Sequence, residues 1–440
     1  MFDLSQYIGA DAGAATIAAR IEAAIADGSL GVGQRLPTVR SLASSLGVSP
    51  ATVAAAYRTL NGRGLIAGNT RLGTTVAAQP PLRVRGAMPL PAGVRDLTGG
   101  NPDRAFLPPL GPALARLDTS HKLYGGPGKL DRLVSLARSD FAGDGIAGDI
   151  AVVGGALDGI ERVLATRLRP GDVVVIEDPG WPRIHDLVRA VGLRPEPVLV
   201  DQRGLVPVDL ERALRRGAKA VIVTPRGQNP TGAFVDADRG QALSALLGEF
   251  PDVFVIEDDY VAAVADAPYV PVHALSPRWV VVRSLSKVLG PDLRIALLAG
   301  DPLTVRQVEG RQLLGAGWVS HLLQQTAAEL WGSASTGGLF ARAREAYAER
   351  RAALVDALTR RGFAAQGGTG LGVWVPVAEE AVVVQRLLER GWAVSAGERF
   401  RHRSPAGIRI TTSDLGLAEA GQLATALDEV TRVVLATYAG

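Results

Sequence analysis

Lys287 is the residue with the clearest potential for covalent chemistry. It lies in a polar stretch, Ser284 to Arg294, directly after the apolar run Trp279 to Val282. The apolar run predicts a buried strand, so the lysine amine lies just beyond a strand end. An amine in this position can form a Schiff base with an aldehyde, and the hydroxyl of Ser284 and the guanidinium of Arg294 suit a phosphate. A lone lysine after a strand is usually only solvated, so this interpretation depends on the residues that accompany it.

Three further apolar runs also end in polar clusters. They are Val173 to Ile176, Ala220 to Val223 and Val253 to Ile256. The runs lack alternation and are separated by helix-length segments, which predicts a mostly parallel α/β sheet covered on both faces. Ligands bind at the carboxyl ends of such strands. The side chains of interest beyond these ends are those of Trp181, Asn229, Asp258 and Tyr260.

The sequence around these residues resembles the class I aminotransferases of pyridoxal-phosphate fold type I. The resemblance rests on the Asn-Pro-Thr-Gly at 229 to 232, on the acidic pair before Tyr260, and on the Ser-x-Ser-Lys at 284 to 287 with Arg294 downstream. It extends from about Leu97 to the end of the chain. It implies an α/β domain with a mostly parallel sheet that binds pyridoxal 5'-phosphate.

The resemblance also implies a role for each residue. Lys287 would carry the Schiff base and later move protons as a general base. Asp258 would pair with the ring nitrogen and keep it protonated, which makes the ring an electron sink. Tyr260 and Asn229 would hydrogen-bond the phenolic oxygen, and Trp181 would stack on the ring. The other implied cofactor contacts are Ser284, Arg294, Gly155, Ala156 and Tyr124.

Three of these contacts lie in glycine-rich segments. Gly155 and Ala156 precede a helical run, and a helix N-terminus presents free amides and a favourable dipole to a phosphate. Relatives commonly carry a hydroxyl residue at the position of Gly154, so here the contact would come from the backbone. A tyrosine like Tyr124 reaches the cofactor phosphate of the neighbouring subunit in the resembled family, which implies a homodimer. A common turn is the alternative for this tyrosine.

The resemblance places a substrate or effector site beside the cofactor. Gly100 belongs to a segment that lines the substrate site in the resembled family. Arg409 lies between apolar neighbours on a predicted short strand and would bind an α-carboxylate with two parallel hydrogen bonds. An ordinary salt bridge is the alternative. We therefore expect an amino compound as a ligand.

The N-terminal residues predict a helix-turn-helix. A first amphipathic helix covers Ala15 to Asp27. Thr38 is a candidate N-cap for a second helix that stops at Gly47. Ser49 and Pro50 are a suitable N-cap and first position for a third helix. Because so few residues join the last two helices, they form a helix-turn-helix.

A two-stranded wing is predicted after these helices, from Leu65 to Ala67 and from Thr74 to Val76. The stretch Gly28 to Val76 resembles the winged helix of the GntR transcription regulators. The DNA contacts that this implies are Arg40, Ser49, Thr52 and Arg71. Pro50 stands where relatives often carry arginine, so fewer side chains can reach the DNA. A helical dimerisation module is the alternative.

Composition excludes several classes of protein. The 440 residues include no cysteine, which excludes disulfides, zinc fingers and a thiol nucleophile, and the five histidines show no metal-ligand spacing. The net charge of +3 is too small to indicate a partner by itself. The start resembles no secretory signal, and no apolar run approaches the roughly eighteen residues of a membrane span. We expect a cytoplasmic protein with no metal and no membrane partner.

The order of these segments predicts the domains. Residues 1–78 form the winged helix-turn-helix, a small α+β domain, and residues 97–440 form the cofactor-binding domain. Residues 79–96 are rich in Pro, Gly and Arg without periodicity, which predicts a linker.

The spacing of the acidic pair narrows the resemblance. Only Asp259 separates Asp258 from Tyr260, a spacing associated with MocR regulators, in which a GntR winged helix is joined to an aminotransferase-like domain. The resemblance implies a dimeric regulator that binds a double-stranded DNA operator and senses an amino compound or pyridoxal phosphate itself. An active aminotransferase with partial or slow turnover, and a pyridoxal-phosphate sensor that controls vitamin B6 synthesis, are the alternatives. The effector, the operator sequence and the direction of regulation stay open at this point.

Overall fold

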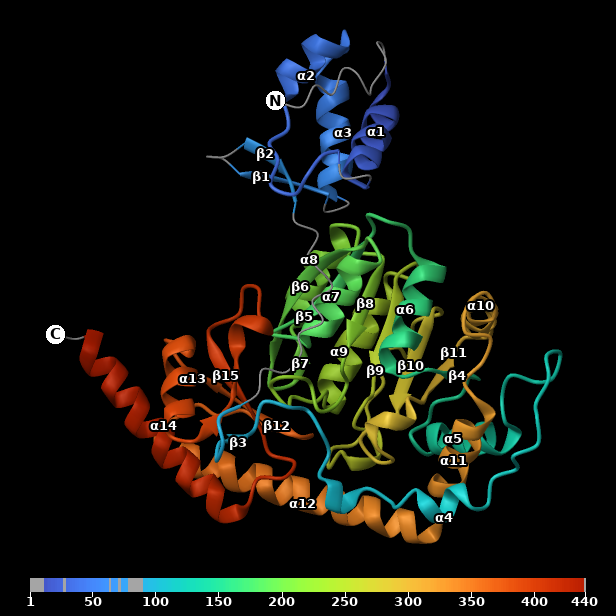
Figure 1. The fold of residues 1–440 in the computed structure, drawn as a ribbon, viewed down its shortest axis with the longest axis vertical. Coiled ribbons are helices and arrows are strands. Elements are labelled where there is room, and N and C mark those ends of the chain that lie inside the picture. Colours follow the sequence, from blue (N-terminus) through green and yellow to red (C-terminus); the bar gives the residue numbers. More distant parts are fainter. Residues whose placement is uncertain (1–11, 27–28, 63–64, 70–72, 78–89, 439–440) are drawn as a thin grey trace. The chain divides into compact units, whose positions relative to one another are not determined.

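Figure 1 shows the computed structural model, which describes residues 12–26, 29–62, 65–69, 73–77 and 90–438. The chain forms two compact units, one of which contains the N-terminal residues and the other most of the remaining chain. The limits of the domains and linker given above stay a prediction. In the described part of the chain, no helix is long and apolar enough to span a membrane.

The N-terminal unit contains three helices and a two-stranded antiparallel sheet. These are α1 (Ala14–Ala26), α2 (Val39–Leu46), α3 (Pro50–Gly62), β1 (Ile66–Asn69) and β2 (Gly73–Val76). Their apolar faces form one core, in which Ile17, Leu42 and Leu60 are fully buried. The Tyr57 hydroxyl donates to the Pro37 carbonyl oxygen at 2.8 Å, which fixes α3 against the segment that leads into α2.

The predicted caps of the helix-turn-helix are confirmed. The Thr38 hydroxyl accepts from the Ser41 amide at 3.2 Å, and Gly47 ends α2 in the left-handed conformation with φ 69°. The Ser49 hydroxyl accepts from the Thr52 amide at 3.1 Å at the start of α3. These local bonds satisfy helix-end groups that would otherwise be unpaired.

An eight-stranded sheet forms the centre of the large unit. Its strand order is β4 (Asp149–Val153), β11 (Ala296–Gly300), β10 (Trp279–Ser284), β9 (Phe254–Asp258), β8 (Ala220–Val223), β5 (Val173–Asp178), β6 (Arg194–Asp201) and β7 (Gly204–Leu205). The four strands β10, β9, β8 and β5 are parallel neighbours, whereas β11 is antiparallel to both of its neighbours. The predicted mostly parallel α/β sheet is therefore confirmed.

Helices flank this sheet (Figure 1). They are α5 (Asp131–Gly143), α6 (Ala156–Arg167), α7 (Pro182–Ala190), α8 (Pro207–Arg215), α9 (Ala237–Gly248), α10 (Pro302–Leu313) and α11 (His321–Trp331), and the short helix α4 (Gly111–Leu114) contacts α11. The main core packs α5 and α11 against the sheet, with Phe141, Val281 and Ala327 buried. Burial on both sides explains why the central strands are continuously apolar.

The C-terminal residues form a smaller subdomain of the large unit. It holds a three-stranded sheet of β12 (Gly372–Pro376), β15 (Gly407–Thr411) and β14 (Ser395–Ala396), with α13 (Glu380–Glu389) and α14 (Leu417–Tyr438). The long helix α12 (Ala334–Thr359) joins the subdomain to the main core, because Phe340 and Tyr347 lie in one core and Leu354 and Leu358 in the other. The strand β3 (Arg95–Asp96), at the end of the predicted linker, pairs with β13 (Trp392–Ala393) in this subdomain.

Candidate functional site

The carboxyl ends of the parallel strands bring the predicted cofactor residues together. Lys287 follows β10, Asp258 ends β9, Asn229 lies on the loop after β8, and Trp181 follows β5. Asp258 is paired in register with Val282 of β10. These strands are neighbours and run in the same direction, so their polar residues collect at one edge of the sheet.

Asp258 is a buried carboxyl group with an unsatisfied oxygen. It is 3 % exposed, and its Oδ1 atom has no hydrogen-bond partner among the described residues. Burial, followed by the nearby charges of Glu177 and Asp259, raises the pKa of Asp258 to about 7. A buried acceptor without a donor is costly. The protonated ring nitrogen of pyridoxal phosphate would supply both the donor and the positive charge, so this residue fits the cofactor.

Asn229 carries a second unsatisfied group at the same edge. Its Oδ1 atom is buried and has no partner among the described residues. Tyr260 donates its hydroxyl to the Gly227 carbonyl at 2.7 Å, and burial raises its pKa above the ordinary value. Tyr260 therefore stays protonated, and its hydroxyl oxygen can still accept a hydrogen bond. Both side chains suit the phenolic oxygen of the cofactor ring.

Lys287 is held as a partly neutral amine. Its Nζ atom donates to the Gly100 carbonyl oxygen and lies 5.8 Å from the centre of the Tyr260 ring. Burial, with the charge of Arg409 as the next cause, lowers the pKa of Lys287 to about 8, and Asp258 opposes this shift. A lowered pKa provides the neutral amine that attack on an aldehyde requires. The structure thus gives Lys287 the surroundings of a reactive lysine.

The predicted phosphate contacts lie at the start of α6. Gly155 has φ 112°, and a Cβ atom there would lie 2.5 Å from Nη2 of Arg294. Arg294 donates from Nη2 to the Gly154 carbonyl at 3.3 Å. The Gly154 amide donates to the Asp158 carboxylate at 2.8 Å, so the amides of Gly155 and Ala156 are the better candidates for an anion. The absence of a side chain at Gly155 leaves room for the guanidinium.

Ser284 and Trp181 are two further cofactor candidates. The Ser284 hydroxyl accepts from the Ser286 amide at 3.2 Å and can still donate its own proton. Trp181 is half-buried and lies directly before α7. Gly180 before it admits no side chain, because a Cβ atom would lie 2.3 Å from the Glu177 carbonyl oxygen.

Arg409 is a buried guanidinium without an acidic partner among the described residues. It is 8 % exposed, and its Nη1 and Nη2 atoms donate only weakly, to the carbonyls of Thr98 at 3.4 Å and Gly99 at 3.5 Å. Built Cβ atoms at Gly100 and Gly372 would lie 3.5 and 3.4 Å from this guanidinium. The salt bridge that was the alternative is thus not seen in the described part. A buried arginine bonded only to carbonyls is suited to a carboxylate ligand.

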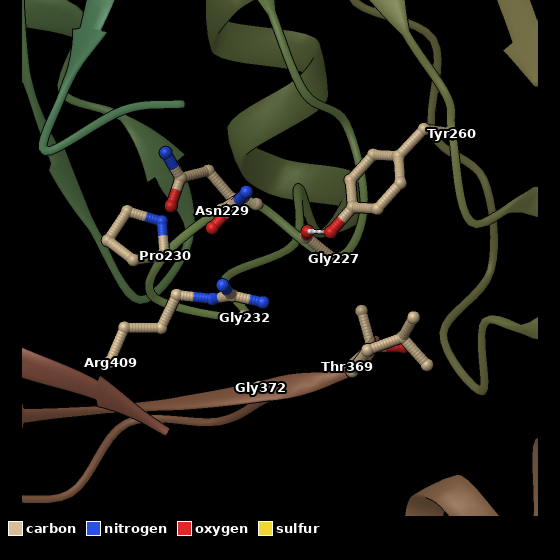
Figure 2. Close-up of a pocket in the computed structure, with 10 residues that line it drawn as sticks. Gly227, Asn229, Pro230, Gly232, Tyr260, Thr369, Gly372 and Arg409 are labelled. Carbon is tan, nitrogen blue, oxygen red and sulfur yellow. Dashed lines mark hydrogen bonds between the residues drawn. The ribbon is translucent and has the colours of Figure 1, made fainter. Parts of the chain in front are cut away.

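Figure 2 shows the pocket in front of this arginine. Its volume is about 10 Å³, roughly the space of one water molecule. Arg409 and Gly372 line it from the C-terminal subdomain, and Tyr260 and Asn229 line it from the strand ends of the main sheet. The pocket therefore lies between the C-terminal subdomain and the strand ends of the main sheet.

Tyr124 is a predicted cofactor residue whose side chain is almost fully exposed. It is 93 % exposed, and its ring packs edge-on against Trp318 with the ring centres 5.5 Å apart. Within the described chain it is not among the residues gathered around Lys287. The neighbouring Leu123 is 80 % exposed.

The predicted DNA contacts lie on the helix-turn-helix. Arg40 on α2 and Ser49 before α3 are exposed, and Thr52 is half-buried. The hydroxyls of Ser49 and Thr52 are 2.8 Å apart, so the two share a hydrogen bond as well as their capping role. Arg58 is a further exposed cation on α3. Arg71 lies outside the described residues.

Glu177 and Asp178 are two site residues to which the sequence assigned no role. Glu177 accepts from the Thr224 amide and hydroxyl, both at 2.9 Å, and from the Gln228 amide group at 3.1 Å. Burial raises its pKa to about 7. These bonds hold the loop that carries Asn229. The only sign in the sequence that Glu177 and Asp178 belong to the site is their position close to Trp181. Their hydrogen-bond partners are distant along the chain.

Family comparisons agree with both halves of the chain. Residues 138–427 match the family "Aminotransferase class I and II", and residues 14–76 match "Bacterial regulatory proteins, gntR family". Among solved structures, a kynurenine aminotransferase of Pyrococcus horikoshii superposes with a TM-score of 0.71 at 22 % identity over 78 % of this chain and 92 % of that one. At this identity the likeness shows the fold.

Relatives at higher identity are transcription regulators. The vitamin B6 salvage pathway transcriptional repressor PtsJ of Salmonella typhimurium is 40 % identical over 90 % of this chain and 93 % of its own length. The pyridoxine biosynthesis regulator PdxR of Corynebacterium glutamicum is 30 % identical over 77 % of each chain. The probable rhizopine catabolism regulatory protein MocR of Rhizobium meliloti is 29 % identical over 78 % of this chain and 76 % of its own. The chain therefore belongs to the MocR-type regulators of the GntR family, which join a gntR-type DNA-binding domain to a pyridoxal-phosphate domain of the class I and II aminotransferases.

Proposed function

We propose that this protein is a transcription regulator that binds pyridoxal phosphate at Lys287 and changes its affinity for DNA in response. The observation that carries the proposal is the unpaired Oδ1 atom of buried Asp258, at the same sheet edge as the amine of Lys287. When bound, the cofactor supplies an aldehyde that bonds to a primary amine and a ring that withdraws electrons. Asp258 pairs with the ring nitrogen and, by its charge, keeps that nitrogen protonated.

The other residues orient the cofactor. Asn229 and Tyr260 bond the phenolic oxygen, and Trp181 covers one face of the ring. The phosphate is held by the backbone amides at the start of α6, by the Arg294 guanidinium and by two hydroxyl groups. The phosphate contacts are Gly155, Ala156, Ser284, Arg294 and the partner subunit's Tyr124.

The DNA partner is a double-stranded operator. Arg40, Ser49, Thr52 and Arg71 contact the DNA, and two winged helices of a homodimer bind two half-sites. A regulator of this kind works where the chromosome is, which in a bacterium is the cytoplasm.

Pyridoxal phosphate itself is the first effector that we propose. The relative with 40 % identity is a repressor of vitamin B6 salvage, and a second relative regulates pyridoxine biosynthesis. An amino compound is the second signal: its carboxylate binds Arg409, while Gly100 leaves space between Arg409 and the Lys287 amine. Either ligand would shift the balance between conformations with different DNA affinity.

Exposed apolar side chains support the homodimer. Leu123, Tyr124, Leu313 and Leu314 are 80 %, 93 %, 69 % and 84 % exposed. Contiguous exposed apolar patches are typical of protein–protein interfaces. A second copy of the chain would cover them and supply Tyr124 to the neighbouring site.

Absorbance and DNA binding measured together test the proposal. Added pyridoxal phosphate should give a visible absorbance band with the native protein and none with Lys287→Ala. The same additions should change the affinity of the native protein for its promoter DNA by about tenfold or more, the size of a typical coupling between two sites. A band without any change in DNA affinity would refute the sensor, and no band would refute the cofactor site.

Aminotransferase activity is a second candidate function. The observation that favours it is the buried guanidinium of Arg409, which has no acidic partner in the described part of the chain and stands beside Gly100, whose carbonyl accepts from Lys287. Steady-state formation of an amino acid from a keto acid would establish it, and Arg409→Ala should remove it while cofactor absorbance remains. Spectral changes without turnover would leave the regulator as the function.

A further inference from the structure

The end of β5 and the loop after it contact the C-terminal subdomain. Asp178 is fully buried, and its carboxylate accepts three backbone amides, from His402 at 2.9 Å, Arg403 at 2.7 Å and Ser404 at 3.2 Å. It also accepts the Ser404 hydroxyl at 2.8 Å. One side chain thus binds three consecutive residues that lie more than two hundred positions away in the chain.

A second bond joins the same two segments. The Gly180 amide donates to the Phe400 carbonyl at 2.7 Å. A Cβ atom at Gly180 would lie 2.3 Å from the Glu177 carbonyl and 2.8 Å from Nε2 of His185, so the loop is packed without spare room. Segment 400–404 is therefore bonded to a loop that has little freedom to move independently.

Each end of this contact leads to a ligand-binding residue. On the loop side, Trp181 follows Gly180 directly and is the residue that we propose to cover the cofactor ring. On the subdomain side, segment 400–404 leads into β15, which carries Arg409. The strand is rigidly held in the subdomain, because Ile408 and Ile410 on either side of the arginine are fully buried in its core.

We propose that Asp178 is a positioning residue that couples cofactor binding to closure of the C-terminal subdomain over Arg409. A cofactor ring that packs against Trp181 restricts the motion of the loop after β5. Because the Asp178 carboxylate is hydrogen-bonded to residues 402–404, the motion of that segment and of β15 is restricted as well. The charge matters because a carboxylate can accept all four donors, whereas an amide side chain in its place offers only one acceptor atom. The inference rests on the proposed cofactor site.

Hydrogen exchange of the full-length protein, with and without pyridoxal phosphate, tests the coupling. The amides of His402, Arg403 and Ser404 can exchange only when their bonds to Asp178 open. In the native protein, pyridoxal phosphate should slow exchange in peptides that span residues 400–406 by about tenfold or more, since a bound ligand suppresses the open state. In Asp178→Asn this slowing should be lost, although the cofactor's visible absorbance still develops.

Two further variants keep the test decisive. Asp186→Asn makes the same chemical change at an exposed position on α7 and should behave as the native protein. Ser404→Ala removes one of the four bonds and should show an intermediate slowing, which decides the matter if Asp178→Asn does not fold. Full slowing in Asp178→Asn, or none in a native protein that binds the cofactor, would overturn the coupling. A native protein without cofactor absorbance would instead refute the proposed cofactor site.

Discussion

At the scale of single residues, the candidate site contains two acids that the fold buries. Asp258 and Glu177 are both less than 10 % exposed, and burial raises the pKa of each to about 7. Neither carboxyl forms an ion pair in the described part of the chain. The unligated protein therefore carries a cost at this sheet edge that a cationic ring nitrogen can remove.

The pH dependence of stability follows from this cost. The folded protein raises the pKa of Asp258 from 3.8 to about 7, so the protonated carboxyl is favoured by folding. Its stabilising effect is present at low pH and is lost as the pH rises between these two pKa values, by about 1.4 kcal/mol for each pH unit. Without cofactor, Asp258→Asn should therefore lose less thermal stability than the native protein between pH 5 and pH 8.

Thermal unfolding of the two proteins at both pH values gives the comparison. Asp186→Asn, at an exposed position, should keep the native pH dependence. If Asp258→Asn and the native protein lost the same amount of stability, Asp258 would not be the group that carries the cost.

At the scale of elements, strand ends and helix starts provide the binding groups. The start of α6 presents its amides where Arg294 adds a guanidinium, and Arg294 itself has a left-handed backbone with φ 49°. Such a conformation is uncommon for a residue with a side chain and often marks a functional site. The arrangement gives a phosphate both a helix dipole and a fork of donors.

Gly155→Ala tests this element. The new Cβ atom would lie 2.5 Å from Nη2 of Arg294, and alanine is strained at φ 112°. The variant should bind pyridoxal phosphate about tenfold or more weakly, because one displaced charge-assisted bond costs about 1.5 to 3 kcal/mol. Pyridoxal, which lacks the phosphate, should bind the variant and the native protein alike.

Spectroscopic titrations with both compounds give these affinities. Gly143→Ala is the matched control, because nothing lies within 4 Å of the added atom. Equal weakening for pyridoxal and its phosphate would mean that the substitution disturbs the site generally.

A separate prediction at this scale concerns DNA binding by the helix-turn-helix. Arg40 is exposed on α2, whereas Arg20 is exposed on α1 outside the turn. Arg40→Ala should weaken binding to promoter DNA and reduce the salt dependence of the affinity by about one phosphate contact. Titrations at several salt concentrations measure this, with Arg20→Ala as the control. An unchanged salt dependence in Arg40→Ala would exclude the proposed docking.

At the scale of the whole molecule, the predicted dimer should complete the cofactor site. Leu314 at the end of α10 is 84 % exposed and Tyr124 is 93 % exposed. Leu314→Asp places a charge in the proposed interface, where desolvation is costly. The variant should be a monomer and should bind pyridoxal phosphate more weakly than the native protein.

Light scattering and spectroscopic titration of the same sample measure both effects. Val208→Asp, a similar change at an exposed position on α8, should affect neither. Tyr124→Phe should remain dimeric while losing affinity for the phosphate compound. A monomeric Leu314→Asp that binds the cofactor as well as the native protein would show that each subunit holds a complete site.

The sequence alone determined the elements and the chemistry of their ends. Continuous apolar runs predicted β5, β8, β9 and β10 within about two residues, because strands buried on both faces need apolar side chains throughout. The caps at Thr38 and Gly47 were equally readable, since capping is a local interaction. The positions of Lys287, Asp258 and Asn229 at or just beyond strand ends were readable for the same reason, and their roles at a cofactor stay a proposal.

Only the tertiary structure decided which groups lack partners and which segments meet. Arg409 could form a salt bridge within the protein or bind the carboxylate of a ligand. In the part of the chain that the structure describes, it donates only to the carbonyls of Thr98 and Gly99, which lie about three hundred residues away in the chain. The role of Asp178 depends on residues 402–404 in the same way. Local sequence determines strands, turns and caps because their bonds span few residues, whereas burial and partner choice arise from contacts between distant parts of the chain.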